Sequence, residues 1–163
     1  MNGHVVVTRN IAAPADSLWR MVADLPRMPE WSPENVRADW LAGATQPTVG
    51  ARFRSANRNG SKTWKSAGEI TECEPGRLLA FRIKAGPFEI SKWTYTFEST
   101  PGGCRVTETW TDQRSRLMKA VSKRVTGVDD RSAHNRRGMQ QTLANLAAAA
   151  GRPAPSTDAK PGH

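Results

Sequence analysis

The chain has 163 residues, of which 37% are hydrophobic and 24% are charged, and its formal net charge is +9. A chain of this length can bury most of its surface in one core without disulfide bonds. No stretch approaches the ~20 consecutive apolar residues that a membrane-spanning helix needs, which excludes proteins built on such helices. The N-terminus lacks a basic and then apolar secretion signal, so we expect a cytoplasmic protein in which Cys73 and Cys104 are reduced.

The first third of the chain predicts a strand, two short helices and two more strands. Residues 5–12 are rich in Val and Ile, which is typical of a strand. A helix follows from Pro14, where proline and acidic residues suit a first turn. Prolines at 26, 29 and 33 limit the next stretch to a short helical turn. Further strands are predicted at 36–40 and 50–57, and Asn59-Gly60 is typical of a hairpin turn.

Residues 61–112 predict an antiparallel meander with one apolar, aromatic face. Large apolar side chains recur there at every second position, which is the period of a half-buried strand. The four runs are Trp64 to Ile70, Leu79 to Ile83, Trp93 to Phe97 and Val106 to Asp112. Turns rich in Gly and Pro separate them. Because an apolar sheet face must be covered, we expect a helix to cover this one incompletely and leave a ligand cavity.

Two helices are predicted after the meander. Leu117, Met118, Val121 and Val125 recur at helical spacing, and Gly127 ends that segment. A long helix then begins at Asp129 or Asp130, either of which suits its positive end, and continues through Ala150. We expect Gly138 to let this helix approach the sheet closely. The chain is then a single domain over residues 1–150 with a disordered tail over residues 151–163.

Several stretches together resemble a known family. They are Asp24 to Pro33, Gly50 to Asn57, Glu72 to Arg77, Arg105 to Glu108 and Asp130 to Asn135. With the predicted element order, they are similar to the START-like (SRPBCC) superfamily, and most of all to its polyketide cyclase/dehydrase-like branch. The resemblance implies an α+β helix-grip (START/Bet v 1-like) fold, in which a curved antiparallel sheet of six to seven strands wraps a long C-terminal helix, with two short helices after the first strand.

The resemblance also implies a hydrophobic cavity between the sheet and the last helix. It does not fix a reaction, because related proteins include cyclases, dehydratases, lipid carriers and ligand sensors. We expect the cavity to hold a small aromatic, polyketide-like or lipid molecule, since indoles suit flat apolar ligands. The candidate ligand-binding residues are Trp31, Trp40, Phe53, Asn57, Trp64, Ile70, Phe81, Trp93, Tyr95, Trp110, Asn135, Met139, Thr142 and Leu143.

Three residues are candidates for catalysis. The alternation turns Glu108 inward among indoles, and burial there would raise the pKa of its carboxyl toward the range of general acid–base work. Tyr95 could stabilise an oxyanion, and His134 could move a proton. The simpler interpretations are a Glu108 paired with an inward Arg or Tyr, a Tyr95 hydroxyl bound to backbone, and a surface histidine.

These candidates define the alternative function, a polyketide aromatase/cyclase or a dehydratase. Such a lyase would need neither a metal nor an organic cofactor. His4, His134 and His163 have no ligand spacing, and the sequence contains no Gly-rich phosphate loop, so we expect no metal and no cofactor.

The segment Arg114–Arg137 is strongly basic. It has eight Lys and Arg against two Asp, and so carries +6 of the net charge of +9. It could be an ordinary solvated face, or it could dock an acidic carrier protein or an anionic membrane surface. We expect no specific nucleic-acid binding, because the Trp residues are predicted to face inward. The oligomeric state is left open.

Overall fold

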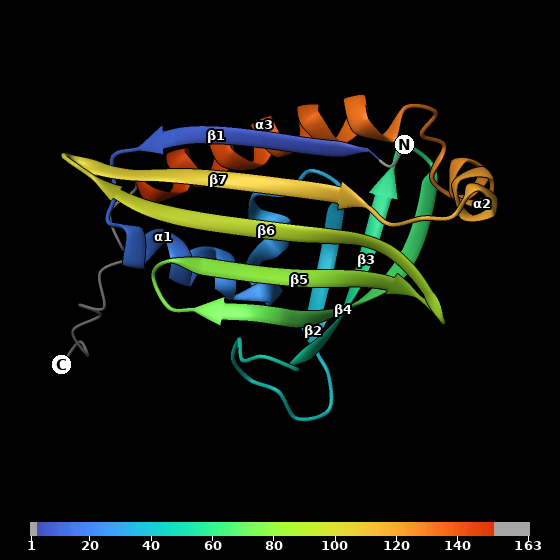
Figure 1. Cartoon of the computed structure of the whole chain (residues 1–163), viewed down its shortest axis with the longest axis horizontal. Helices are drawn as coiled ribbons and strands as arrows, with labels where there is room; N and C mark the ends of the chain where they lie inside the picture. Colours follow the sequence, from blue (N-terminus) through green and yellow to red (C-terminus); the bar gives the residue numbers. More distant parts are fainter. Residues whose placement is uncertain (1–2, 152–163) are drawn as a thin grey trace, which may run out of the picture.

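The computed structural model describes residues 3–151, which form one seven-stranded antiparallel sheet with a long helix against it (Figure 1). The strands are β1 (His4–Ile11), β2 (Asn35–Trp40), β3 (Arg52–Asn59), β4 (Lys62–Glu74), β5 (Leu78–Ala85), β6 (Phe88–Thr100) and β7 (Gly103–Asp112). Their spatial order is β1-β7-β6-β5-β4-β3-β2. The predicted helix-grip fold is confirmed.

Four helical segments accompany the sheet. They are α1 (Ala15–Ala23), the 3-10 helix η1 (Leu25–Glu30), α2 (Arg116–Thr126) and α3 (Arg131–Ala150). The two short helices follow β1 as expected. The predicted tail lies outside the described residues, apart from Gly151. Within the described part of the chain, no helix is both long enough and apolar enough to cross a membrane.

The start of α3 is fixed by Asp130. Its carboxylate accepts a hydrogen bond from the backbone N–H of Ala133 at 3.0 Å. This bond satisfies one of the free N–H groups at the start of the helix, so Asp130 rather than Asp129 is the cap. The helix then runs along the sheet, where it packs most closely on β1 (Figure 1). Met139, Leu143 and Leu146 form its buried stripe.

The predicted alternation of side chains is confirmed in β7. Every second residue of this strand is buried, from Cys104 through Glu108 to Asp112. Pairing with β6 sets Tyr95 opposite Glu108 and Trp93 opposite Trp110. The inward side chains of the two strands therefore form one continuous wall.

The core fills one end of the space under the sheet. Leu18 and Trp19 of α1 and Leu25 of η1 pack there against the sheet and α3. Phe53, Phe81 and Tyr95 form a line of rings, with centroids 5.4 Å and 6.4 Å apart. Cys104 belongs to this core, and both Cys73 and Cys104 are free thiols, as expected.

Gly68 of β4 and Gly138 of α3 differ in how closely other atoms surround them. A Cβ on Gly68 would clash with the Phe53 ring, whereas a Cβ on Gly138 would meet no atom within 4 Å. The expected close approach of the last helix at Gly138 is therefore wrong. Gly138 lines a cavity instead, whereas the missing side chain of Gly68 permits a close contact with Phe53.

Replacing each glycine with alanine should change stability in opposite directions. Gly68→Ala should lower the free energy of unfolding by about 1–3 kcal/mol, because the added methyl overpacks against Phe53. Gly138→Ala should raise it by up to about 1 kcal/mol, because alanine is the better helix former and the space is open. Urea denaturation measures both changes, and equal effects would contradict the packing described for Phe53.

Candidate functional site

A cavity of about 650 Å³ opens between the sheet and α3, beyond the packed core. Indoles from three strands line it, namely Trp64 of β4, Trp93 of β6 and Trp110 of β7. Across from them lie Asn135, Met139 and Thr142 of α3. The α2 helix contributes to one end of the wall.

Most of the predicted ligand-binding residues line this cavity. They are Phe53, Asn57, Trp64, Phe81, Trp93, Tyr95, Trp110, Asn135, Met139 and Thr142. The structure places the other four, Trp31, Trp40, Ile70 and Leu143, in or against the packed core instead. Trp31 follows η1, and the rings of Trp40 and Phe53 form a T-shaped pair with centroids 6.2 Å apart, so both tryptophans serve packing.

Glu108 and Tyr95 form a buried pair in the cavity wall. The Tyr95 hydroxyl donates to Oε1 of Glu108 at 2.7 Å, and the Glu108 residue is only 2% exposed. Burial raises the pKa of Glu108 to about 8, against the smaller lowering effect of the Tyr95 hydrogen bond. Burial and the neighbouring Glu108 also raise the pKa of Tyr95. Both groups are therefore mainly protonated at neutral pH.

The second oxygen of Glu108 is the distinctive feature of the wall. Oε2 is buried and has no hydrogen-bond partner among residues 3–151. A buried polar atom without a partner costs free energy. Tyr95 also makes its hydrogen bond to this carboxyl and not to backbone. The pair thus leaves one carboxyl oxygen of the cavity wall without a partner.

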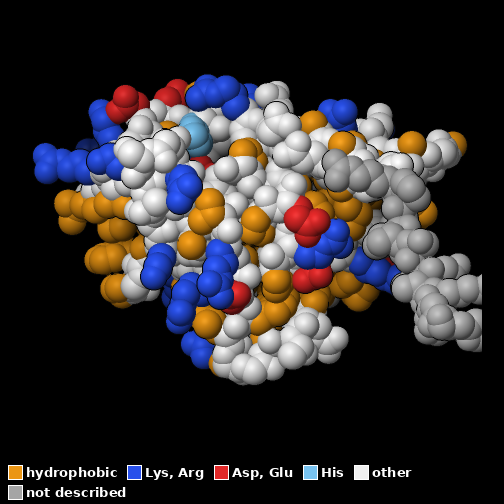
Figure 2. Space-filling view, turned by 180° about the vertical axis from the view of Figure 1, so that it is seen from behind, with side chains coloured by type: hydrophobic (Ala, Val, Ile, Leu, Met, Phe, Trp, Pro, Cys, Tyr) orange, Lys and Arg blue, Asp and Glu red, His pale blue; other side chains and the backbone are white. Residues whose placement is uncertain are grey.

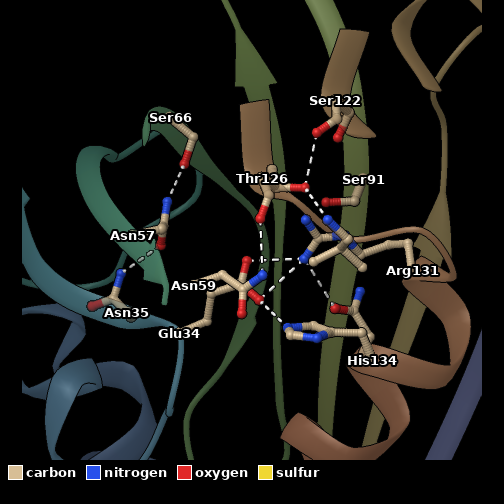
Figure 3. Close-up of polar contacts among 12 residues, drawn as sticks. Glu34, Asn35, Asn57, Asn59, Ser66, Ser91, Ser122, Thr126, Arg131 and His134 are labelled. Atoms are coloured by element: carbon tan, nitrogen blue, oxygen red, sulfur yellow. Dashed lines mark hydrogen bonds and ion pairs between the residues drawn. The ribbon is translucent and has the colours of Figure 1, made fainter. Parts of the chain in front are cut away.

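His134 belongs to a different polar cluster at the start of α3. Glu34, just before β2, accepts from Arg131 Nη1 at 2.9 Å and lies 2.8 Å from His134 Nε2 (Figure 3). The Arg131 guanidinium lies 5.7 Å from the Trp64 ring centroid. This cluster joins the loop before β2 to α3, and all three of its members line the cavity.

The family of the chain follows from comparison with known proteins. Residues 2–151 match the sequence model of the family described as polyketide cyclase/dehydrase and lipid transport. The chain belongs to this family. A Streptomyces cyaneus relative, described as a candidate polyketide cyclase, is 34% identical over 107 residues, covering 65% of this chain and 70% of the relative.

Solved structures agree with this fold. A ginseng (Panax ginseng) major latex-like protein is 10% identical and superposes with a TM-score of 0.69, covering 93% of this chain and 99% of its own. A polyketide cyclase-like protein of Corynebacterium glutamicum is 24% identical and superposes with a TM-score of 0.56. The match covers 93% of this chain and 91% of the other protein. At such identities the likeness shows the fold alone. Members of this family typically bind hydrophobic ligands, and the cavity of this one has the matching walls.

Asn57 of this polyketide cyclase/dehydrase family member is already engaged. Its amide oxygen accepts from Asn35 at 3.2 Å, and its amide nitrogen donates to Ser66 at 3.3 Å (Figure 3). These three polar side chains form a hydrogen-bonded row across β2, β3 and β4. Asn57 therefore holds the strands together at the cavity wall. Two buried oxygens of cavity-lining residues have no hydrogen-bond partner among residues 3–151, Oε2 of Glu108 and Oδ1 of Asn35, and only the first belongs to an ionisable group.

The α2 helix is attached to the sheet through a few polar contacts. Arg114 donates to the Ser122 hydroxyl at 3.0 Å, and Asn59 donates to the Thr126 carbonyl at 2.9 Å. Gly127 ends the helix with a φ of 69°, a conformation that glycine adopts at little cost. Met118, Val121 and Val125 of α2 line the cavity.

Sequence reasoning missed Glu34. Nothing in the run Ser32-Pro33-Glu34 marks a functional group, because its partners lie about a hundred positions away. The only available signal was the spacing of Arg131 and His134, which are three residues apart and so share one helix face. That spacing indicates a common partner but cannot identify it.

Proposed function

We propose that the protein binds a small, largely apolar molecule that carries an oxygen atom, and that Glu108 recognises this oxygen. An aromatic ketone, a polyketide-like compound or an oxygenated lipid would fit this description. The observation that carries the proposal is the buried Glu108 carboxyl with its unpartnered Oε2 in a cavity lined by indoles.

The size and walls of the cavity support an apolar ligand. Small-molecule sites generally measure about 300–1,000 Å³ and are mainly hydrophobic with a few placed polar groups. The cavity of about 650 Å³ lies in that range. Trp64 and Trp93 are half-buried at this wall, so part of each indole is open to a planar ring, while Trp110 is packed behind them.

The protonation of Glu108 supports a ligand with an acceptor oxygen. With a pKa of about 8, this carboxyl keeps its proton at neutral pH. Tyr95 already donates to Oε1, so we assign the carboxyl proton to Oε2. Oε2 is buried in the structure, so a carbonyl or hydroxyl oxygen of the ligand would reach this proton as the side chains around it shift. That bond would replace the missing partner of a buried polar atom, which makes it favourable.

A second candidate function is catalysis by the same pair. A carboxyl that is neutral near pH 7 is suited to protonate an oxygen as a general acid, which dehydration or aldol cyclisation requires. The description of the Streptomyces relative supports this class of reaction. We prefer binding because His134, the candidate second proton carrier, contacts Glu34, and no hydrogen bond among residues 3–151 joins it to Glu108 or Tyr95.

A pair of probes tests the role of Glu108. Anthraquinone and anthracene have the same ring skeleton, and only the first has carbonyl oxygens. Titrations followed by tryptophan fluorescence should show that both compounds bind. Glu108→Leu should lower the affinity for anthraquinone about tenfold, because one hydrogen bond is lost. The affinity for anthracene should not change.

The matched control is Glu98→Leu, the same change at an exposed position of β6, and it should alter neither affinity. Equal losses for the two probes would refute recognition of an oxygen by Glu108. Failure of both probes, and of a set of ketones and fatty acids, to bind the unmodified protein would refute the cavity as a ligand site. Recovery of a β-hydroxyketone probe in dehydrated form would favour the second function.

A further inference from the structure

One end of the molecule exposes apolar side chains from two distant segments. Phe88 at the tip of the β5–β6 hairpin is 50% exposed, and on α2 Leu117 is 71%, Val121 44% and Val125 43% exposed. Figure 1 places the hairpin tip and α2 at the same end of the sheet, opposite α1. Figure 2 shows hydrophobic side chains gathered along that edge, with Lys and Arg beside them. We call these four residues the apolar end.

The charged residues of α2 are all basic, and the nearby acids Asp129 and Glu89 are each paired with a lysine. The α2 helix contains Arg116, Lys119, Lys123 and Arg124 and no acidic residue. Lys123 pairs with Asp129 at 2.9 Å. Within residues 3–151, Arg116 and Arg124 form no ion pair, so their charge is available to an external anion.

The same two segments also form part of the cavity wall. Val121 and Val125 of α2 line it, as do Ala85 and Ile90 of the hairpin. A surface that covers the apolar end therefore lies directly beside the cavity. The attachment of α2 through Asn59 and Arg114 leaves most of its outer surface uncovered.

We propose that the apolar end docks on an anionic lipid bilayer. A helix with aliphatic residues on one side and Lys and Arg beside them binds in the plane of a membrane interface, with its apolar side chains among the acyl chains. Basic residues near an anionic surface add electrostatic attraction. Phe88 supplies an aromatic anchor from a second segment.

Docking itself depends only on these surface residues. Its consequence rests on the proposed function: a bilayer at the apolar end would adjoin the cavity, so that an apolar ligand could pass between the two without crossing water. The occupant of the cavity is then a molecule that dissolves in membranes. An acidic protein partner on the same surface is the competing explanation, and the test separates the two.

The test is co-sedimentation of the purified full-length protein with vesicles. Vesicles of phosphatidylcholine alone should retain little protein, and vesicles of equal parts phosphatidylcholine and phosphatidylglycerol should retain most of it at low salt. Charge reversal by Arg116→Glu with Arg124→Glu should reduce partitioning by at least about tenfold. Leu117→Ser with Phe88→Ser should reduce it similarly, and both pairs of positions are exposed, so the fold should be retained.

The matched controls are Arg9→Glu and Val49→Ser. Both residues are exposed and lie outside α2 and the hairpin, and both variants should bind vesicles as the unmodified protein does. Binding that is equal for the two vesicle types, or unaffected by the charge reversal, would overturn the proposal. Absence of vesicle binding would do so as well and would favour a protein partner. Because the assay needs no ligand, these outcomes leave the role of Glu108 to be judged separately.

Discussion

Glu108→Gln should make the protein more stable at neutral and alkaline pH. The pKa of Glu108 is about 8 in the folded protein against an ordinary value of 4.5, which the unfolded chain restores. As pH rises between these values, the unfolded state loses this proton and the folded state retains it. Folding stability therefore falls with pH across that window.

The size of the effect follows from the same numbers. Each pH unit inside the window costs about 1.4 kcal/mol, so the wild-type penalty from Glu108 reaches about 3 kcal/mol near pH 7. Glutamine has nearly the same shape and keeps an oxygen that can accept from Tyr95, but it has no proton to lose. The advantage of Glu108→Gln should grow from less than about 1 kcal/mol near pH 5 to its full value near pH 8.

Urea denaturation of both proteins across this pH range measures the difference. Glu98→Gln is the control, because Glu98 is an exposed residue of the neighbouring strand and should show no such trend. A difference in the free energy of unfolding that does not change with pH would mean that Glu108 ionises as readily in the folded protein as in the unfolded chain. The proposed hydrogen-bond donor would then not exist.

The strands were predictable because the period of two is a strong local signal. Glu108 could be assigned to the inner face from its spacing to Val106 and Trp110 alone, and the buried pairing with Tyr95 follows once the last two strands are adjacent. The start of α3 was predictable for a similar reason. An aspartate before a helical stripe is a local feature, and Asp130 has the expected bond.

The limits of the cavity could not be predicted in the same way. Trp31 and Trp40 are as large and apolar as Trp64 and Trp93, and alternation cannot tell a core position from a cavity position on the same face. The difference arises from what lies opposite. The short helices fill one end of the space, and the open surface at Gly138 leaves room at the other.

Asp112→Ala should destabilise the protein strongly at neutral pH. Asp112 is 3% exposed and accepts from the Nε and Nη2 atoms of Arg114 at 2.9 and 2.8 Å, and from its backbone N–H at 3.0 Å. Burial alone would raise the pKa of Asp112, but the hydrogen bonds from Arg114 outweigh this effect and lower it. The carboxylate thus contributes stability that is present above its ordinary pKa of 3.8 and is lost as pH falls below it.

Removing one partner of a buried ion pair costs about 3–5 kcal/mol, because the other charge remains buried without compensation. The double variant Asp112→Ala with Arg114→Met removes both charges and keeps an apolar side chain of similar length. It should recover most of the loss, whereas independent contributions would make the two single effects add. Urea denaturation of the two single variants and the double variant decides between these outcomes.

The same pair also determines how firmly α2 is held. Arg114 is positioned by Asp112 and donates to Ser122 in the middle of the helix, so loss of the carboxylate releases a contact that joins β7 to α2. Amide hydrogen exchange in Asp112→Ala should therefore accelerate more in α2 than in β1, beyond the change expected from lower global stability. Equal acceleration in both elements would mean that α2 is held by its apolar contacts at the cavity instead. In that case the helix that carries the apolar end would be a fixed wall of the site rather than a loosely attached one.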